Sequence, residues 1–393
     1  MEKSKTPFYP GQPVPVDFFV GRLPEIKRIT RAIEQVALGK MQSVFLSGEY
    51  GIGKSSLAGF LRCFAEEKCG ILGIHIFLGG AETLEDVAIK TVEAVLKQQR
   101  YQDTKWEKIK DFFARYIGQQ TLFGVNINFE ALKADGPNLS HGFLPFLSGI
   151  FDKFKDDGVK GIMLIFDELN GITKNKQFSH FIKSLVDENA VSARPLPLML
   201  MLCGIEERRR EMIEHHAPVE RIFDVVEIKQ MDESEMKDFF SKSFESAGIR
   251  VLPTAMEELI FYSSGFPKLM HIIGDNIFWM DKDGVIDKHD ARRGIRFAAE
   301  DVGKKFVAQQ VYKALRSDDY RSILKKLSKE NFDLEFSKNI IEKGLSTSEK
   351  KKFHNFLQRM KKLGLFKAGE NKGEYIFTNR LARLYIKLEA LGK

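Results

Sequence analysis

A glycine-rich stretch between an apolar run and a helical pattern offers the clearest chemistry in the sequence. Residues 48–55 read GEYGIGKS and fit the pattern G-x-x-x-x-G-K-[ST]. Between a strand and a helix, such glycines let backbone N–H groups turn toward a phosphate, and the helix N-terminus adds partial positive charge. We expect Lys54 to reach the β- and γ-phosphate oxygens and Ser55 to give Mg²⁺ a hydroxyl ligand. The alternative is a glycine turn that only joins strand to helix. The predicted nucleotide-binding residues of this loop are Gly48, Glu49, Tyr50, Gly51, Ile52, Gly53, Lys54, Ser55 and Ser56.

An acidic pair at the end of a second apolar run supplies the partner for this loop. The stretch IMLIFDE covers residues 162–168 and places Asp167 and Glu168 after a buried strand. We expect Asp167 to hold Mg²⁺, directly or through water, and Glu168 to act as general base on an attacking water. The alternative is a solvated acidic turn. A pair of carboxylates rather than one favours hydrolysis over binding alone.

Length and composition limit the class of protein. At 393 residues the chain is too long for one ordinary core, so two or three domains are expected. The apolar run LPLMLML at 196–202 is too short to cross a bilayer, and the first residues contain no apolar signal segment. Cys63, Cys69 and Cys203 lack metal-type spacing, and their odd number argues against a disulfide framework. We therefore expect a cytoplasmic protein without membrane association.

The order of patterns along the chain predicts the domains. Strands alternate with helices up to about residue 229, and two near-continuous apolar runs are typical of parallel strands covered on both faces. This predicts an α/β P-loop NTPase core with a doubly wound parallel sheet. Four helical patterns with little strand signal follow the core. Within the core itself, an alternating stretch at 121–131 suggests a strand or hairpin. The predicted domains are an extended arm (1–20), the α/β core (21–229, with an insertion around 101–157), a helical domain (231–306) and a C-terminal domain (311–393).

The C-terminal domain carries the positive charge of the chain. Residues 311–393 hold 20 Lys or Arg and 10 Asp or Glu, whereas the rest holds 41 and 44. Helical patterns near 318–328 and 335–343 precede a capping box, Ser346 with Glu349, and a third helix. Two short strands around the turn 369–373 follow. Helix, helix, helix, hairpin is the order of a winged helix.

Polar side chains on the third helix and the hairpin are suited to nucleic acid. Lys and Arg can meet phosphates, and Asn and Gln can meet base edges. The residues predicted to contact double-stranded DNA are Lys350, Lys351, Asn355, Gln358, Arg359, Lys362, Lys367 and Lys372. The alternatives are a winged helix that packs against its own core and a lysine-rich helix that is merely solvated.

These motifs, in this order, resemble the AAA+ ATPases, and within them the initiator-like branch that includes origin-recognition subunits and transposition regulators. The resemblance covers residues 17–306. The stretch DFFVGR at 17–22, with Glu25, is similar to the box that precedes the first helix of the family. The resemblance implies that Val20 and Gly21 lie against the adenine.

Two further stretches resemble sites at which the family senses its nucleotide. The stretch GFPK at 265–268 is similar to the G-x-P-R turn of the helical lid, which implies that Lys268 touches the γ-phosphate. The stretch HAPVERIF at 216–223 is similar to the segment with the arginine finger, which implies that Arg221 reaches the nucleotide of a neighbouring subunit. The alternative for Arg221 is an ion pair with an acidic neighbour.

Departures from the family pattern limit the functional expectation. The strand that ends near Cys203 shows no evident polar sensor residue, which puts efficient hydrolysis in doubt. We expect an ATPase of low intrinsic turnover that binds ATP or ADP with Mg²⁺. It would act as an ATP-driven switch on DNA and assemble as a homo-oligomer or with a partner protein. The alternative is a slowly hydrolysing signalling NTPase whose winged helix docks proteins.

Overall fold

The protein is described by a computed structural model that covers residues 5–15, 19–96, 138–313, 315, 317–330 and 334–391. The predicted strand or hairpin at 121–131 lies outside these residues, as does part of the box at 17–22. The described chain forms two compact units, one from Pro13 to Lys229 and the other from the residues up to Gln12 together with those from Gln230 onward. The predicted helical and C-terminal domains fall in the same unit, so the boundary between them stays a prediction.

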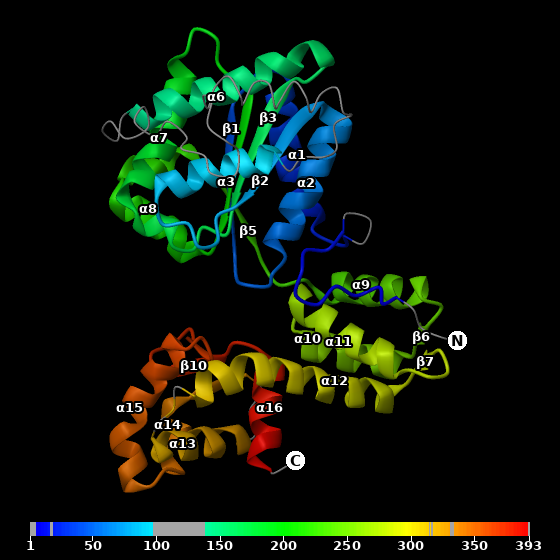
Figure 1. Ribbon diagram of the computed structural model, residues 1–393. Helices are drawn as coiled ribbons and strands as arrows, with labels where there is room; N and C mark the ends of the chain where they lie inside the picture. Colours follow the sequence, from blue (N-terminus) through cyan, green and yellow to red (C-terminus); the bar gives the residue numbers. More distant parts are fainter. Residues whose placement is uncertain are drawn as a thin grey trace. The chain divides into compact units, whose positions relative to one another are not determined.

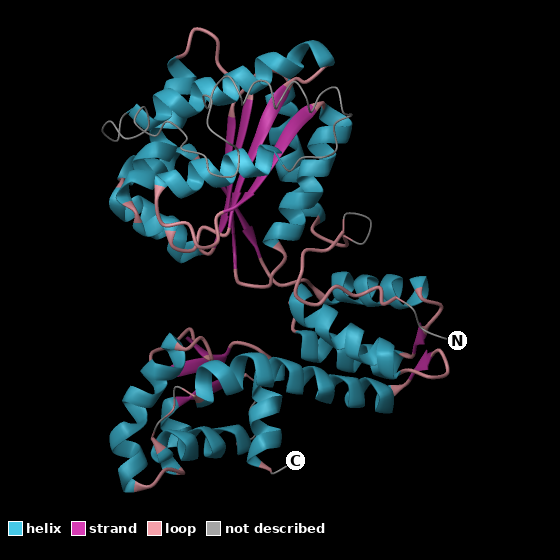
Figure 2. Ribbon diagram, in the orientation of Figure 1, coloured by secondary structure: helices cyan, strands magenta, loops and turns pink. Residues whose placement is uncertain are grey.

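The first unit is built on a five-stranded sheet in which every neighbouring pair is parallel (Figure 2). The strand order β2-β3-β4-β1-β5 places β1 and β4 side by side in the interior of the sheet. The predicted doubly wound parallel sheet is therefore confirmed, although the fifth strand had no predicted counterpart. The strands are β1 (Gln42–Gly48), β2 (Ile71–Phe77), β3 (Gly161–Asp167), β4 (Leu198–Gly204) and β5 (Asp224–Ile228).

Helices cover both faces of this sheet (Figure 1). Alternate residues of the strands, such as Leu72, Ile74 and Ile76, join a buried cluster with side chains of α3, α6, α7 and α8. The residues between them face α2, since a Cβ added to Gly73 would meet the Arg62 side chain at 2.3 Å. The helices are α1 (Leu23–Ala37), α2 (Lys54–Cys69), α3 (Leu84–Leu96), α6 (Asn138–Phe154), α7 (Lys176–Val191) and α8 (Glu206–His215).

The second unit contains four helices, and a segment of the N-terminal arm packs against two of them, α9 and α11. Phe8 is 2% exposed, its ring lies 4.9 Å from that of Phe244, and it fills the space above Gly274. The Tyr9 N–H donates to Nδ1 of His271, and burial lowers the pKa of His271 to about 4, so that the imidazole stays a neutral acceptor. This part of the predicted extended arm is a component of the helical core. The elements are α9 (Glu233–Ser246), β6 (Arg250–Val251), α10 (Pro253–Ser263), α11 (Pro267–Met280), β7 (Val285–Ile286) and α12 (Lys288–Val302).

The C-terminal part of this unit combines short helices with a three-stranded antiparallel sheet, in the order β8-β10-β9. The predicted helix at 335–343 is wrong in its first three residues, which form β8 because they pair with β10. The last helix, α16, had no predicted counterpart. The elements are a π-helical segment (Gly303–Tyr312), α13 (Asp318–Lys329), β8 (Glu335–Ser337), α14 (Lys338–Lys343), α15 (Thr347–Lys362), β9 (Phe366–Ala368), β10 (Glu374–Phe377) and α16 (Arg380–Ala390).

The first residue of α16 ties the C-terminal part to the four helices. The Arg380 guanidinium donates to Ser264 Oγ at 2.9 Å and lies 4.3 Å from the centre of the Phe261 ring. Ser264 immediately precedes the turn that leads to Lys268. None of the described helices is long and apolar enough to span a membrane.

Candidate nucleotide site

The glycine-rich loop connects β1 to α2 with the backbone shape that its sequence predicts. Gly51 and Gly53 have φ values of 78° and 98°, in the left-handed region that a glycine adopts without strain. A Cβ on Gly48 would approach the Ile52 side chain at 2.9 Å and the Ile228 carbonyl at 3.0 Å. Gly51 and Gly53 are therefore required by the backbone conformation, and Gly48 by the lack of room for a side chain. The result is an open turn of backbone at the N-terminus of α2.

Lys54 is the first residue of α2, and its side chain turns back over the loop. The Nζ atom donates to the carbonyl oxygens of Gly48 and Glu49, both at 2.9 Å. Burial lowers the pKa of the Lys54 ammonium, while the neighbouring Cys203, Asp167 and Glu49 act in the opposite direction. An ammonium group held by carbonyl oxygens at the N-terminus of a helix is suited to bind a negatively charged phosphate.

Asp167 ends β3 beside this lysine and is almost fully buried, with 1% of its surface exposed. Its Oδ1 accepts the N–H of Glu168 at 2.8 Å, and its Oδ2 lies 3.1 Å from Nε2 of His75 on the neighbouring strand β2. An ionised carboxylate can only accept hydrogen bonds, so Nε2 of His75 is the donor of this bond when Asp167 is ionised. The carboxylate is therefore held by two donors on the face of the sheet that α2 covers.

Glu168 follows with an unusual backbone. Its φ of 59° is in the left-handed region, which non-glycine residues rarely adopt, so the position is strained. A Cβ added to Gly79 would meet Oε2 of Glu168 at 2.3 Å, so the carboxylate rests where only a glycine leaves room. Strained backbone at a site of this kind is typical of functional residues. The sequence-predicted pair thus lies together with Lys54 at the carboxyl end of the sheet.

Cys203 takes the position on β4 where the sequence offered no polar sensor. It pairs with Leu46 of β1, and β4 lies between β1 and β3. The side chain is fully buried, and burial raises the pKa of the thiol, with the Asp167 carboxylate adding to the effect. A neutral, weakly polar thiol therefore stands beside Asp167.

Arg22 is a residue of the site whose role the sequence reasoning missed. It is only 5% exposed and has a φ of 65°. Its guanidinium donates to the Ile52 carbonyl in the loop at 3.1 Å and to the carbonyl of Lys229, at the end of this unit. Arg22 belongs to the box at 17–22 that was identified for its resemblance, so the motif itself was the available signal. Val20 and Gly21, the predicted adenine contacts, directly precede it.

The N-terminal segment also contacts the helix that follows the loop. The Val14 N–H donates to Ser56 Oγ at 3.1 Å. The Tyr50 hydroxyl, on the outer side of the loop, donates to the Asn170 side chain at 2.7 Å. These bonds connect the loop region to two other segments of the same unit, one before α1 and one after β3.

Arg221 and Lys268 are both exposed. Arg221 lies in a short 3₁₀ helix (Ala217–Ile222), and it makes no ion pair or hydrogen bond with any described residue. The alternative pairing with an acidic neighbour is thus not seen in the described part of the chain. Lys268 is the second residue of α11 and belongs to the other unit, so its predicted contact with a γ-phosphate stays a prediction.

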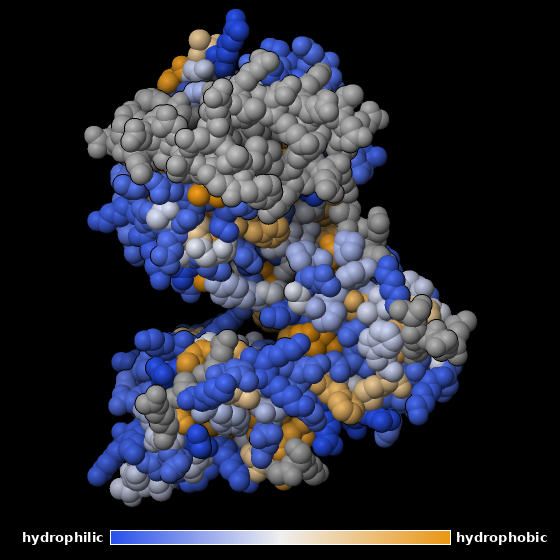
Figure 3. Space-filling view, in the orientation of Figure 1, coloured by the Kyte–Doolittle hydropathy of each residue, from blue (hydrophilic) through white to orange (hydrophobic). Residues whose placement is uncertain are grey.

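The helix α15 presents its polar residues outward. Lys350, Lys351, Asn355, Gln358, Arg359 and Lys362 are exposed on it, Lys372 is exposed in the hairpin, and Lys367 is half-buried. Its only acidic residue, Glu349, is buried, so the exposed face is positive. Figure 3 shows mostly hydrophilic residues over this helix, at the lower left. The surface suits a polyanion.

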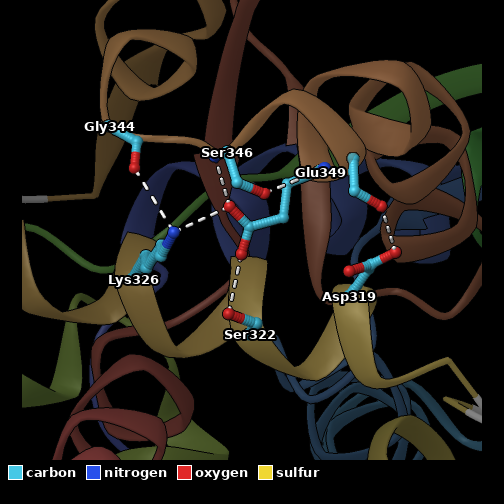
Figure 4. A network of polar contacts seen from close by, with 7 residues as sticks. Asp319, Ser322, Lys326, Gly344, Ser346 and Glu349 are labelled. Atoms are coloured by element: carbon cyan, nitrogen blue, oxygen red, sulfur yellow. Dashed lines mark hydrogen bonds and ion pairs between the residues drawn. The ribbon is translucent and has the colours of Figure 1, made fainter.

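A polar network fixes the start of α15 against α13 (Figure 4). Glu349 is 3% exposed and accepts from Lys326 Nζ and Ser322 Oγ, each at 2.7 Å, and from the N–H of Ser346 at 2.6 Å. Ser346 Oγ in turn accepts the N–H of Glu349, which completes the predicted capping box. Burial alone would raise the pKa of Glu349, but the bonds from Lys326, Ser322 and Ser346 outweigh it and lower the pKa to about 2.

Replacing Glu349 should weaken the C-terminal part. We expect Glu349→Ala to lower the free energy of unfolding by about 2 kcal/mol, because Lys326 and the Ser346 N–H lose a charged acceptor. Since the pKa of Glu349 is depressed from 4.5 to about 2 in the folded state, its contribution should be complete above pH 4.5 and lost as the pH falls toward 2. Urea denaturation at several pH values measures both effects. Ser348→Ala removes only an exposed bond to Asp319 and is the control; an equal loss in both variants would contradict the prediction.

A parallel sheet with a glycine-rich loop after β1, and an acidic pair at the end of β3, defines the fold of a P-loop NTPase. Comparisons with known proteins agree with this class. A family profile described as "BREX system ATP-binding protein BrxC/D" matches residues 16–85, which contain the box, the loop and β2. None of the curated protein sequences compared with the chain is significantly similar to it.

Solved structures resemble nearly the whole chain. The Walker-type ATPase PABY2304 of Pyrococcus abyssi is 17% identical, with a TM-score of 0.57 over 94% of this chain and 96% of that one. The ORC2 protein of Aeropyrum pernix, solved as ADPNP–ADP complexes, is 13% identical, with a TM-score of 0.56 over 95% of each chain. At these identities the likeness shows the fold. The resemblance to initiator-like AAA+ ATPases is confirmed at that level.

Proposed function

We propose that this chain binds ATP with Mg²⁺ and hydrolyses it slowly. The observation that carries the proposal is the convergence of Lys54, Asp167 and Glu168 at the carboxyl end of one parallel sheet, beside the glycine turn. Ligands of α/β proteins bind at that edge of the sheet. The family profile over residues 16–85 and the nucleotide complexes of the A. pernix protein support the same choice.

The residues present fit the nucleotide and the ion. The loop offers backbone in the left-handed shape, and the half-buried Lys54 ammonium lies over it. Ser55 and Asp167 would hold Mg²⁺, which would neutralise charge on the phosphate oxygens when bound. Glu168 would take the proton of the attacking water, and Val20 and Gly21 would line the base. With Cys203 where the resemblance implies a polar sensor, hydrolysis would be slow, because a thiol is only a weak donor and acceptor for a water or phosphate.

Features of the C-terminal part support the proposal that the protein is an ATP-driven switch that acts on double-stranded DNA. Its three helices and antiparallel strands follow the order of a winged helix, and the exposed face of α15 is positive. In this proposal Lys268 contacts the γ-phosphate and thereby couples the bound nucleotide to the position of the helical lid. Arg221, exposed and without an ion-pair partner among the described residues, completes the site of a neighbouring subunit.

Steady-state ATP hydrolysis, measured with and without double-stranded DNA over a range of protein concentrations, tests the proposal. If the protein assembles on DNA, we expect DNA to increase the rate of ATP hydrolysis. We also expect this rate to increase more than in proportion to the protein concentration. Absence of ATP hydrolysis under every condition would overturn the assignment as an ATPase.

DNA binding itself should depend on salt. We expect the logarithm of the affinity to fall with the logarithm of the salt concentration by about 0.9 per phosphate neutralised. The double variant Arg359→Ala, Lys362→Ala should reduce this slope by about 1 for each residue that contacts a phosphate. Fluorescence anisotropy with labelled duplex measures the slope. Lys242→Ala, on the remote helix α9, is the matched control, and equal slopes in all three proteins would contradict a DNA surface on α15.

A specific observation also favours the second candidate, a signalling NTPase whose C-terminal part docks proteins. Arg380 binds the C-terminal part to Ser264 and Phe261 of the chain's own helical part. Slow turnover unaffected by DNA, together with weak, non-specific DNA binding, is the result expected for this alternative.

A further inference from the structure

The partner of Asp167, the half-buried His75, lies on a different strand and belongs to no motif. β2 and β3 pair in parallel, with Phe77 opposite Asp167 and His75 opposite Ile165. Because side chains alternate along a strand, His75, Phe77 and Asp167 share one face, which is the face that α2 covers. The register therefore brings an imidazole to the carboxylate that is predicted to bind metal.

Contacts within the protein itself hold the His75 ring in place. Its side chain is 9% exposed, and its ring lies nearly parallel to that of Phe77, with centroids 4.5 Å apart. Nε2 lies 3.1 Å from Oδ2 of Asp167, while Oδ1 accepts the Glu168 N–H. With one donor on each oxygen, the carboxylate has a fixed plane. Each oxygen still has a lone pair for a further ligand.

We propose that His75 is a positioning residue that orients Asp167 for a divalent cation. The inference rests on the proposed function, since it concerns the same site. A carboxylate that is free to rotate loses conformational entropy when it binds a cation, and a second hydrogen-bonded partner removes that cost beforehand. Outer partners of this kind typically change metal affinity by about 10- to 100-fold. His75 acts through Asp167 and need not touch nucleotide or ion.

Three variants separate positioning from packing. His75→Phe keeps a ring against Phe77 but removes the donor to Asp167. His75→Gln replaces the ring with an amide whose nitrogen can occupy the place of Nε2 and restore the bond. Phe77→Leu removes the ring contact and leaves the bond, so it is the matched control for packing.

The measurement is binding rather than turnover. A fluorescent ATP analogue is titrated onto each full-length variant in EDTA to measure the metal-free nucleotide affinity. In a separate sample freed of EDTA by buffer exchange, Mn²⁺ is titrated onto the nucleotide-loaded protein and followed by electron paramagnetic resonance. We expect His75→Phe to raise the half-saturating Mn²⁺ concentration by about 10- to 100-fold and to leave the metal-free nucleotide affinity unchanged. His75→Gln should recover most of the loss, and Phe77→Leu should behave as the unmodified protein.

Each outcome decides a different question. Unchanged Mn²⁺ binding in His75→Phe overturns the inference and leaves the proposed function intact. A parallel loss of metal-free and metal-dependent binding, together with a lower melting temperature, assigns His75 a packing role and also overturns it. An unmodified protein that binds no ATP analogue overturns the proposed function itself.

Discussion

Lys54→Ala should abolish nucleotide binding at ordinary ATP concentrations. The Lys54 ammonium lies half-buried over the loop and would meet phosphate oxygens as the principal positive charge of the site. Charge-assisted hydrogen bonds of this kind are strong, so their removal should weaken binding at least about 100-fold, equivalent to about 2.7 kcal/mol. Isothermal titration calorimetry with ATP and Mg²⁺ measures the change.

Lys40→Ala is the matched control for this variant. Lys40 is exposed just before the start of β1, and Lys54 follows the loop at the other end of the same strand. Both variants remove one positive charge from the same unit. An equal loss of affinity would attribute the effect to net charge, and unchanged affinity in Lys54→Ala would remove the phosphate role from the loop.

The parts of the fold that the sequence predicts are those encoded by local pattern. β3 and β4 are buried along their whole length, so their sequences are continuous apolar runs that stand out. β5 is a strand at the sheet edge, with exposed and buried residues mixed, and its five residues carry little signal. β8 became a strand only because β10 lies beside it, and such pairing between distant segments is not visible in a local pattern.

The same division runs through the site. The loop, Asp167 and Glu168 are recognisable because their chemistry requires fixed spacing within one segment. The contacts of Arg22 with Ile52 and of His75 with Asp167 join segments that are brought together by the sheet and its helices. Arg22 was within a recognised motif without an assigned role. His75 lies in an ordinary strand pattern, and only the register of β2 against β3 reveals it.

The N-terminal arm shows how a tertiary contact can reverse an interpretation of composition. A segment rich in Pro and Phe without periodicity predicts an extended arm. Phe8 instead fills a space that exists because Gly274 has no side chain, and His271 accepts the neighbouring N–H. The space for Phe8 forms only when α9 and α11 have packed together, so no pattern within residues 1–20 could predict this contact.

Glu168→Gln should retain ATP binding and lose turnover. The amide is nearly isosteric with the carboxylate, so it should fit over Gly79 and keep the strained backbone of residue 168 in place. It cannot accept the proton of an attacking water, and loss of a general base typically costs about 100- to 10,000-fold in rate.

Single-turnover hydrolysis, with calorimetry for binding, separates the two effects in this variant. Glu214→Gln, an exposed neutralisation on α8, is the control and should leave the rate unchanged. Unchanged turnover in Glu168→Gln would remove Glu168 from the role of base. The proposed function is slow hydrolysis, so the rate of the unmodified protein should already be low. A steep loss in Glu168→Gln from a slow starting rate is therefore the pattern that the site predicts.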